Sequence, residues 1–282
     1  MPNSTRRRLN LAYVPLLIWS VVILFPLYWM VITSFKLPID INRGVSYIPW
    51  VDFTPSLHAW QDLMQGAVPI ADPLRNSFLA ASISSLAAVI LGGMAGYGLS
   101  RFHYRWGPWG NKEIAFWFIS QRMLPPAAAI LAFMVMFNYL HLLDSVPGLA
   151  IAYTGFNLPF AIWIMRDFFL ALPRELEESS LVEGAGWFTT FWRIVLPLSI
   201  PGLAATGILL FIFSWNEYLF ASLLAFEKAK TMPVTIAGMA TAIGVRWWLM
   251  SALAIVSMVP TVLLGLLLER YIVRGLTAGA IK

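Results

Sequence analysis

Six segments of this 282-residue chain are each long and apolar enough to cross a membrane as a helix. A helix needs about 20 residues to cross the hydrocarbon core of a bilayer. In that core only helices and closed barrels satisfy their backbone hydrogen bonds, and barrel strands would show short alternating runs instead. We therefore predict an all-α integral membrane protein with six transmembrane helices, at residues 11–33, 77–100, 114–140, 146–165, 198–226 and 247–268.

The composition also indicates a membrane protein, since 59% of the residues are hydrophobic and 12% are charged. Six spans place both termini on one side. If that side is the cytoplasm, the inner segments carry twelve Lys and Arg residues and the outer segments carry six. The positive-inside rule therefore predicts a multi-pass protein of the cytoplasmic (inner) membrane, with N- and C-termini in the cytoplasm and lipid around it. No cluster of basic and aromatic residues indicates a nucleic acid partner.

Chemistry within the chain is limited by its residue types. It has no cysteine, and its three histidines fall in three different connections without ligand spacing, so we expect no metal and no cofactor. No connection is long enough to fold as a soluble catalytic domain. We expect a single transmembrane domain over 1–282 that is not an enzyme, so any catalysis must come from another chain.

The only large cytoplasmic element precedes the fifth span. Pro173 suits a first helical turn, and the glutamates that follow it complement the helix dipole. Gly184 then ends or bends that helix, and Phe188, Phe191, Trp192 and Val195 form an apolar stripe on a second one. We predict two short helices joined by a glycine elbow. Periodicity alone does not distinguish a docking element from an amphipathic connection between spans.

The spacing of five residues in this element is more specific. Glu178, Gly184, Ile194, Leu196 and Pro197 resemble the EAA loop of the inner-membrane permease subunits of bacterial ABC importers. Ser179 and Ser180 stand where that family usually has two alanines. Further stretches resemble the carbohydrate-uptake branch, related to the maltose-type second permease, over essentially the whole length: SFK at 34–36, SQRMLPP at 120–126, WNEYLFA at 215–221 and RGLTAGAIK at 274–282.

The resemblance implies the type I importer (MetI-like) permease fold, with a cytoplasmic coupling helix in an EAA loop over 171–197. It also implies a second homologous permease, two ABC ATPase subunits that hold ATP and Mg, and a periplasmic or extracellular solute-binding protein as partners. The elbow would dock on the ATPase. Its contact would involve Glu178, Ser179, Ser180, Leu181, Val182, Gly184, Ala185, Trp187 and Phe188, with Ile194, Leu196 and Pro197 leading into the fifth span.

Two predicted spans contain an ionised residue, which is costly inside a bilayer and therefore worth explaining. Glu217 lies among Trp215, Asn216 and Tyr218, whose side chains could hydrogen-bond or stack on a sugar, so these four residues are candidates for the solute path. Alternatively, Glu217 pairs with Arg122 or with the second permease. Arg122 precedes two prolines and could serve the structure there, or it could contact an anionic solute.

The function expected from this reading is ATP-driven import of a sugar or sugar-like solute, such as a mono- or disaccharide, a polyol or an anionic sugar derivative, by alternating access. The alternative is an ion-coupled secondary transporter or channel, which would need several buried ionisable groups or an internal repeat. An intramembrane enzyme would need paired catalytic groups at one depth, and Glu217 with Arg122 supplies no nucleophile and base.

Overall fold

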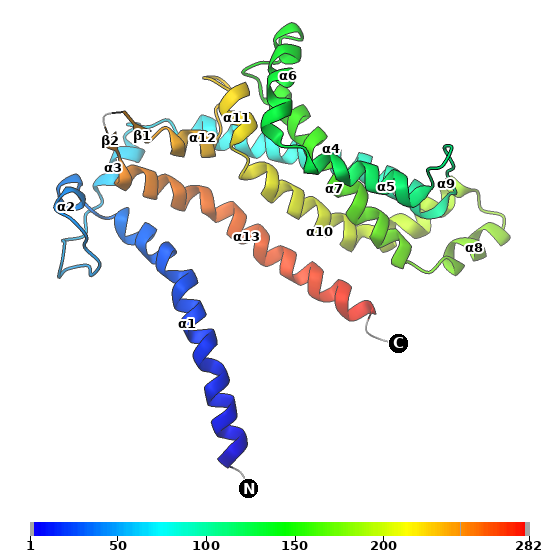
Figure 1. Cartoon of the computed structure of the whole chain (residues 1–282), viewed down its shortest axis with the longest axis horizontal. Coiled ribbons are helices and arrows are strands. Elements are labelled where there is room, and N and C mark those ends of the chain that lie inside the picture. The colour runs from blue at the N-terminus through cyan, green and yellow to red at the C-terminus, as the bar shows by residue number, and fades with distance from the viewer. Residues whose placement is uncertain (1–2, 243, 280–282) are drawn as a thin grey trace. The chain divides into compact units, whose positions relative to one another are not determined.

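The computed structural model describes residues 3–242 and 244–279, with side chains over 13–242 and 244–269. The chain divides into two compact units, one of Met1–Ile70 with Thr235–Val259 and one of Ala71–Val234 with Pro260–Lys282. The expected single domain over 1–282 therefore stays a prediction, and each unit is described by itself. Figure 1 labels the helices and strands of both.

The first unit holds the first helix and the segments around it. Lys36 is buried there, and its Nζ donates to the Ser46 carbonyl at 2.6 Å and lies 4.2 Å from the Trp29 ring centroid. The elements wholly within it are α1 (Asn3–Thr33), α2 (Pro38–Asn42), α3 (His58–Met64) and the two-stranded antiparallel sheet of β1 (Ala240–Thr241) and β2 (Gly244–Val245). Helices α12 (Met232–Ala237) and α13 (Trp247–Gly279) each have residues in both units.

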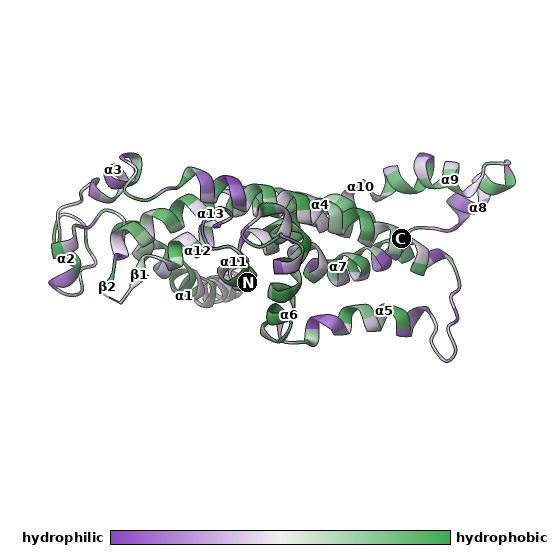
Figure 2. Cartoon of the chain, turned by 90° about the horizontal axis from the view of Figure 1, so that it is seen from above, coloured by the Kyte–Doolittle hydropathy of each residue, from purple (hydrophilic) through white to green (hydrophobic). Residues whose placement is uncertain are grey.

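The second unit is built on three long helices, α4 (Ala71–Arg101), α7 (Val146–Ala171) and α10 (Leu196–Trp215). Helix α4 lies along α7, and α10 packs on both, as Figure 1 shows. In Figure 2 these helices are largely green, whereas α8 (Glu175–Val182) carries purple, hydrophilic residues. The remaining elements are α5 (Asn111–Ser120), η1 (Gln121–Met123), α6 (Pro126–Tyr139), α9 (Trp187–Thr190), the π-helix η2 (Phe191–Val195) and α11 (Leu219–Leu224).

Glycines allow the close contact between α4 and α7. A Cβ added at Gly92 would lie 2.3 Å from the Cβ of Ala161, and one added at Gly96 would lie 2.8 Å from the backbone nitrogen of Arg166. Two small residues four apart let helix backbones approach in a membrane. The sequence GGMAGYG at 92–98 therefore serves as a packing motif between α4 and α7.

Within the described residues, five helices are long and apolar enough to cross a membrane, or six if α5 with η1 and α6 together form one span. That pair is bent by 87° at a break, although the sequence suggests one helix over 114–140. Pro125 and Pro126 explain the break, because proline donates no backbone hydrogen bond and forces the preceding residue out of the helical region. Leu124 is accordingly extended, with φ −66° and ψ 131°.

The fifth predicted span, 198–226, also differs from the observed helix. Helix α10 ends at Trp215, and α11 begins at Leu219 after a short break. At the break, side chains form hydrogen bonds with the backbone groups that a continuous helix would pair. The Asn216 amide donates to the Ile212 carbonyl at 2.8 Å, and the Glu217 carboxylate accepts the N–H groups of Phe220 and Ala221. Hydropathy does not detect the break because its flanking residues are apolar.

An aspartate fixes the chain that follows α11. The Asp144 carboxylate accepts the backbone N–H groups of all four residues of 226–229, at 2.9–3.1 Å. Burial by itself would raise the pKa of Asp144, but these four donors outweigh it and hold the pKa below its ordinary value. The turn before α7 is thereby held against the segment after α11.

We expect Asp144→Ala to lower the thermal stability of the protein at neutral pH. Since the folded-state pKa lies below the unfolded one, the stabilisation is complete above the unfolded pKa, about 3.9, and is lost as the pH falls through the folded-state value. The melting temperatures of the wild type and the variant should therefore converge in acid, and Asp72→Ala, at an exposed carboxylate, is the control. A difference that persists undiminished at about pH 2 would contradict this account.

Candidate functional site

The elbow expected from the sequence is present. Helix α8 ends at Val182, Gly184 has φ +90°, and α9 begins at Trp187. Only glycine adopts this left-handed conformation without strain, which explains why the chain turns here. The second limb differs from the prediction, because α9 runs through η2 directly into α10 instead of ending before Pro197. Proline cannot donate to a carbonyl four residues earlier, and a π-turn accommodates that loss.

Four large apolar side chains of the elbow are exposed, and three of them lie in the first turns of the continuous helix Trp187–Trp215, which is long and apolar enough to cross a membrane. Val182 is 89% exposed and Phe188 is 76% exposed, and Trp187 and Trp192 are also more than half exposed. Large apolar side chains gathered on one exposed turn indicate a surface that another molecule covers. We call this set of four side chains the elbow patch.

The predicted contact residues lie on and beside the elbow patch. Glu178, Ser179 and Gly184 are exposed, and Ser180 is half-buried with its hydroxyl 3.1 Å from that of Thr190. The Ser180–Thr190 contact joins the two limbs across the turn. The others are exposed or half-buried at these positions: Leu181, Ala185, Ile194, Leu196 and Pro197.

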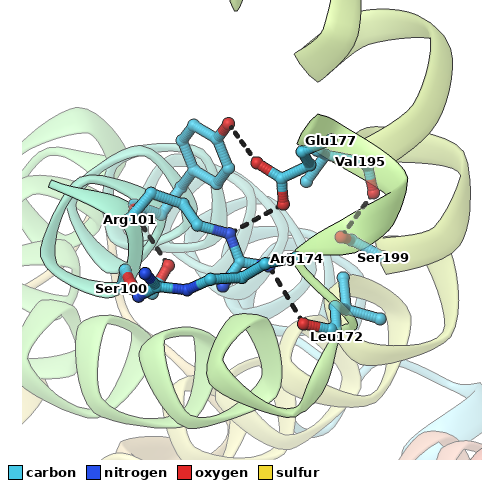
Figure 3. A network of polar contacts seen from close by, with 8 residues as sticks. Ser100, Arg101, Leu172, Arg174, Glu177, Val195 and Ser199 are labelled. Atoms are coloured by element: carbon cyan, nitrogen blue, oxygen red, sulfur yellow. Dashed lines mark hydrogen bonds and ion pairs between the residues drawn. The ribbon is translucent and has the colours of Figure 1, made fainter. Parts of the chain in front are cut away.

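One residue of the elbow was missed by the sequence analysis as a functional candidate. Glu177, the neighbour of Glu178, points inward and is 6% exposed in its side chain. Its Oε1 lies 2.7 Å from Nε of Arg101, the last residue of α4, whose side chain is 4% exposed (Figure 3). Only two features of the sequence hint at this ion pair. One is an arginine that ends an uncharged span, and the other is a set of three glutamates in one helical turn.

The second candidate region is a cavity of about 260 Å³ in the second unit. Its lining includes Arg122 from η1, Tyr153 and Asn157 from α7, and Asn216 and Glu217 from the break after α10. The structure thus brings together three of the five predicted solute-path residues. Tyr218 is exposed but does not line the cavity, and Trp215 is buried, with its ring stacked 5.8 Å from that of Phe211.

The two charged residues of this cavity do not form an ion pair with each other in the described part of the chain. Arg122 donates to the Phe156 carbonyl at 2.9 Å, and its guanidinium lies 3.9 Å and 4.3 Å from the ring centroids of Phe156 and Phe160. Such cation–π contacts stabilise a cation in an apolar setting. Glu217 instead caps α11. Both residues therefore have structural contacts while still facing the cavity.

Comparison with known proteins places this geometry in a family. Residues 77–277 match the family described as binding-protein-dependent transport system inner membrane component. The chain is 30% identical to the trehalose/maltose transport system permease protein MalG of Thermococcus litoralis, with 94% of each protein covered. It is 29% identical to the sulfoquinovosyl glycerol transport system permease protein SmoH of Agrobacterium fabrum, with 92% of this chain and 89% of that protein covered.

A similar fold occurs in a solved structure, described as a bacterial ABC transporter involved in the import of the acidic polysaccharide alginate. The TM-score is 0.76 at 20% identity, and the match covers 96% of this chain and 98% of the other. At that identity the likeness establishes the fold alone.

Proposed function

The chain belongs to the family of binding-protein-dependent transport system inner membrane components, and from this premise we propose that it imports a sugar or sugar-like solute in an assembly with a second permease, two ATPase subunits and a solute-binding protein. The resemblance read from the sequence, and the fold class that it implied, are confirmed by the family match and the similar solved fold. The family match does not favour the alternative of an ion-coupled transporter or channel.

The observation that carries the proposal is the elbow patch. Exposed Val182, Trp187, Phe188 and Trp192 flank a sharp glycine turn, and exposed large apolar side chains of this kind suit a docking contact. We assign the ATPase as the partner that covers it, because the sequence resemblance implies that separate ATPase subunits hold ATP and dock on this loop. The excess of Lys and Arg in the predicted inner segments supports a cytoplasmic position for the elbow and both termini, on the side of ATP.

The solute class is proposed from the relatives. Proteins named for transport of trehalose or maltose and of sulfoquinovosyl glycerol match 94% and 92% of this chain, at 30% and 29% identity. We infer a solute with several hydroxyl groups, neutral or with one acidic group. The cavity residues Asn216, Glu217 and Arg122 offer amide, carboxylate and guanidinium groups that suit hydroxyls and an anion.

The experiment that tests the function is reconstitution in liposomes with the partner subunits. Uptake of labelled trehalose, maltose and a sulfonated sugar is measured with ATP inside, with and without vanadate, together with copurification of the ATPase. We expect vanadate-sensitive uptake of at least one sugar. Uptake indifferent to vanadate, or a purified chain that never retains an ATPase, would overturn the proposal.

The absence of cysteine allows a direct test of the solute path. We expect Asn216→Cys, at an exposed cavity-lining position, to react with a water-soluble maleimide and to be protected about tenfold by saturating solute, since a bound ligand must leave before the thiol is reached. The labelling rate with and without solute is the measurement. Val182→Cys is the matched control, because the ATPase should protect it and the solute should not. Equal labelling rates of the Asn216→Cys variant with and without solute would remove Asn216 from the path.

A further inference from the structure

The end of α4 contacts both limbs of the elbow, and polar side chains, among them the buried Arg101 and Glu177, form the junction with the first limb. Besides Arg101, Glu177 accepts a hydrogen bond from the Tyr97 hydroxyl at 3.0 Å. Arg101 also donates to the Leu172 carbonyl at 3.2 Å, just before α8 begins. In the opposite direction, the Arg174 side chain donates to the Ser100 carbonyl at 2.9 Å (Figure 3). Four hydrogen bonds therefore join the last turn of α4 to the first limb.

Aromatic rings join the same end of α4 to the second limb. The Tyr97 ring lies 4.9 Å from that of Phe191 in η2 and 5.4 Å from that of Phe169 at the end of α7. Phe102, just after α4, lies 5.5 Å from Trp187, which begins α9. Tyr97 thus belongs to both junctions, with its hydroxyl on Glu177 and its ring against the second limb.

These contacts define two routes from the elbow into the second unit. One continues along the chain from α9 through η2 into α10, and η2 is a π-helix, whose hydrogen-bond pattern is irregular. The other crosses from Glu177 to Arg101 into a continuous helix of 31 residues. Because α4 meets α7 in backbone contact at Gly92 and Gly96, a displacement of its end carries α7 with it. The second route is therefore the stiffer one.

Stability alone does not account for this ion pair. A buried ion pair loses its hydration, and apolar residues of similar volume often stabilise a fold as well or better. Arg101 also keeps Nη1 buried without a hydrogen-bond partner among the described residues, which a purely stabilising site would avoid. Unlike apolar side chains, the ion pair forms a short and directional contact. Such a contact keeps α8 and the end of α4 together whether they are pressed toward each other or drawn apart.

We propose that Arg101 and Glu177, with Tyr97, are positioning residues that transmit movement of the elbow into α4 and α7. This inference rests on the proposed docking of the elbow on an ATPase. The side chains of Arg101 and Glu177 are buried, and neither lines the cavity that holds Arg122 and Glu217. Their role is to make the elbow and the end of α4 move as one body, so that ATP-driven motion reaches the second and fourth predicted spans as well as the fifth.

The test compares solute uptake and ATP hydrolysis in reconstituted transporters that carry Glu177→Gln, Tyr97→Phe or the apolar double variant Arg101→Met with Glu177→Leu. Losing a hydrogen bond to a charged group shifts an equilibrium by about tenfold, so we expect solute imported per ATP to fall about tenfold in Glu177→Gln and in the double variant, and less in Tyr97→Phe. The double variant removes the buried charges and so keeps the fold testable. Asp167→Asn is the control, because the Asp167 side chain is 54% exposed in its ion pair with Arg166.

Two outcomes would overturn the inference. One is an unchanged ratio of uptake to hydrolysis in the double variant. The other is release of the ATPase from the double variant, which would mean that the ion pair only shapes the docking surface. Phe188→Ser separates this inference from the proposed function, because it alters the elbow patch without touching Glu177. If Phe188→Ser retains the ATPase at wild-type affinity, docking by the elbow fails whatever the double variant does.

Discussion

Gly184→Asp is expected to abolish solute uptake while the protein still inserts in the membrane. Gly184 is exposed with φ +90°, and an added Cβ would meet no heavy atom of this chain within 4 Å. The substitution therefore leaves the packing of the chain itself intact. Apart from the backbone strain that any side chain adds at this φ, its effect falls on whatever covers the turn, because a carboxylate would be desolvated beside Val182 and Phe188 without a partner.

The measurement is uptake in reconstituted liposomes together with the amount of ATPase that copurifies. Leaving a charge buried and unpaired at an interface costs about 2–5 kcal/mol, enough to reduce complex formation by more than tenfold. Gly184→Asn is the matched control for charge, since asparagine has nearly the same shape and tolerates positive φ. Gly66→Asp is the control for position, because Gly66 has φ +81° and equally open surroundings in the first unit.

Three outcomes have distinct meanings. If both Gly184 variants lose solute uptake, the cause is the bulk of the new side chain or backbone strain. If only Gly184→Asp loses uptake, the cause is the charge. Normal transport in Gly184→Asp would contradict docking by the elbow. The last result would leave the family membership intact and would remove the elbow patch from the proposed mechanism.

The elbow could be predicted from sequence because its determinants are local. Gly184 ends a helix, and the apolar stripe from Phe188 onward repeats with helical spacing, so both features lie within about three turns of chain. The long apolar segments were predictable for the same reason, since hydropathy is a sum over neighbours. The bounds of the fifth span were not, because the end of α10 depends on which backbone groups the Asn216 and Glu217 side chains contact.

The choice between Glu177 and Glu178 shows the limit of a motif. Spacing singled out Glu178, which the structure leaves exposed, whereas the buried ion pair uses Glu177. Its partner Arg101 lies 76 residues earlier, and nothing local in either segment pairs them. A contact of this kind requires knowing that α4 ends beside α8. Arg122 and Glu217 show the opposite error. An ion pair between them was one of the alternatives from the sequence, but in the described chain Arg122 bonds the Phe156 carbonyl and Glu217 accepts from the Phe220 N–H.

Gly92→Ala and Gly93→Ala are expected to change stability in opposite directions, although they add the same methyl group to adjacent positions of one helix. At Gly92 the new Cβ would lie 2.3 Å from the Ala161 Cβ and 2.9 Å from the Ala161 backbone carbon, so α4 and α7 must separate. At Gly93 the nearest atom, a Leu203 methyl, lies at an ordinary contact distance of 3.5 Å. Overpacking of this kind typically costs about 1–3 kcal/mol.

Helix propensity favours both variants, because replacing glycine by alanine in a helix contributes up to about 1 kcal/mol of stability where space allows. Only at Gly92 does overpacking oppose that gain. Gly93→Ala should therefore melt above the wild-type temperature, and Gly92→Ala several degrees below it, in thermal denaturation of the purified protein. If α4 carries elbow movement to α7 through this contact, Gly92→Ala should also import less solute per ATP than Gly93→Ala. Equal melting temperatures for the two variants would mean that α4 and α7 do not meet at Gly92, and the stiff route from the elbow through α4 would then end before it reached the fourth span.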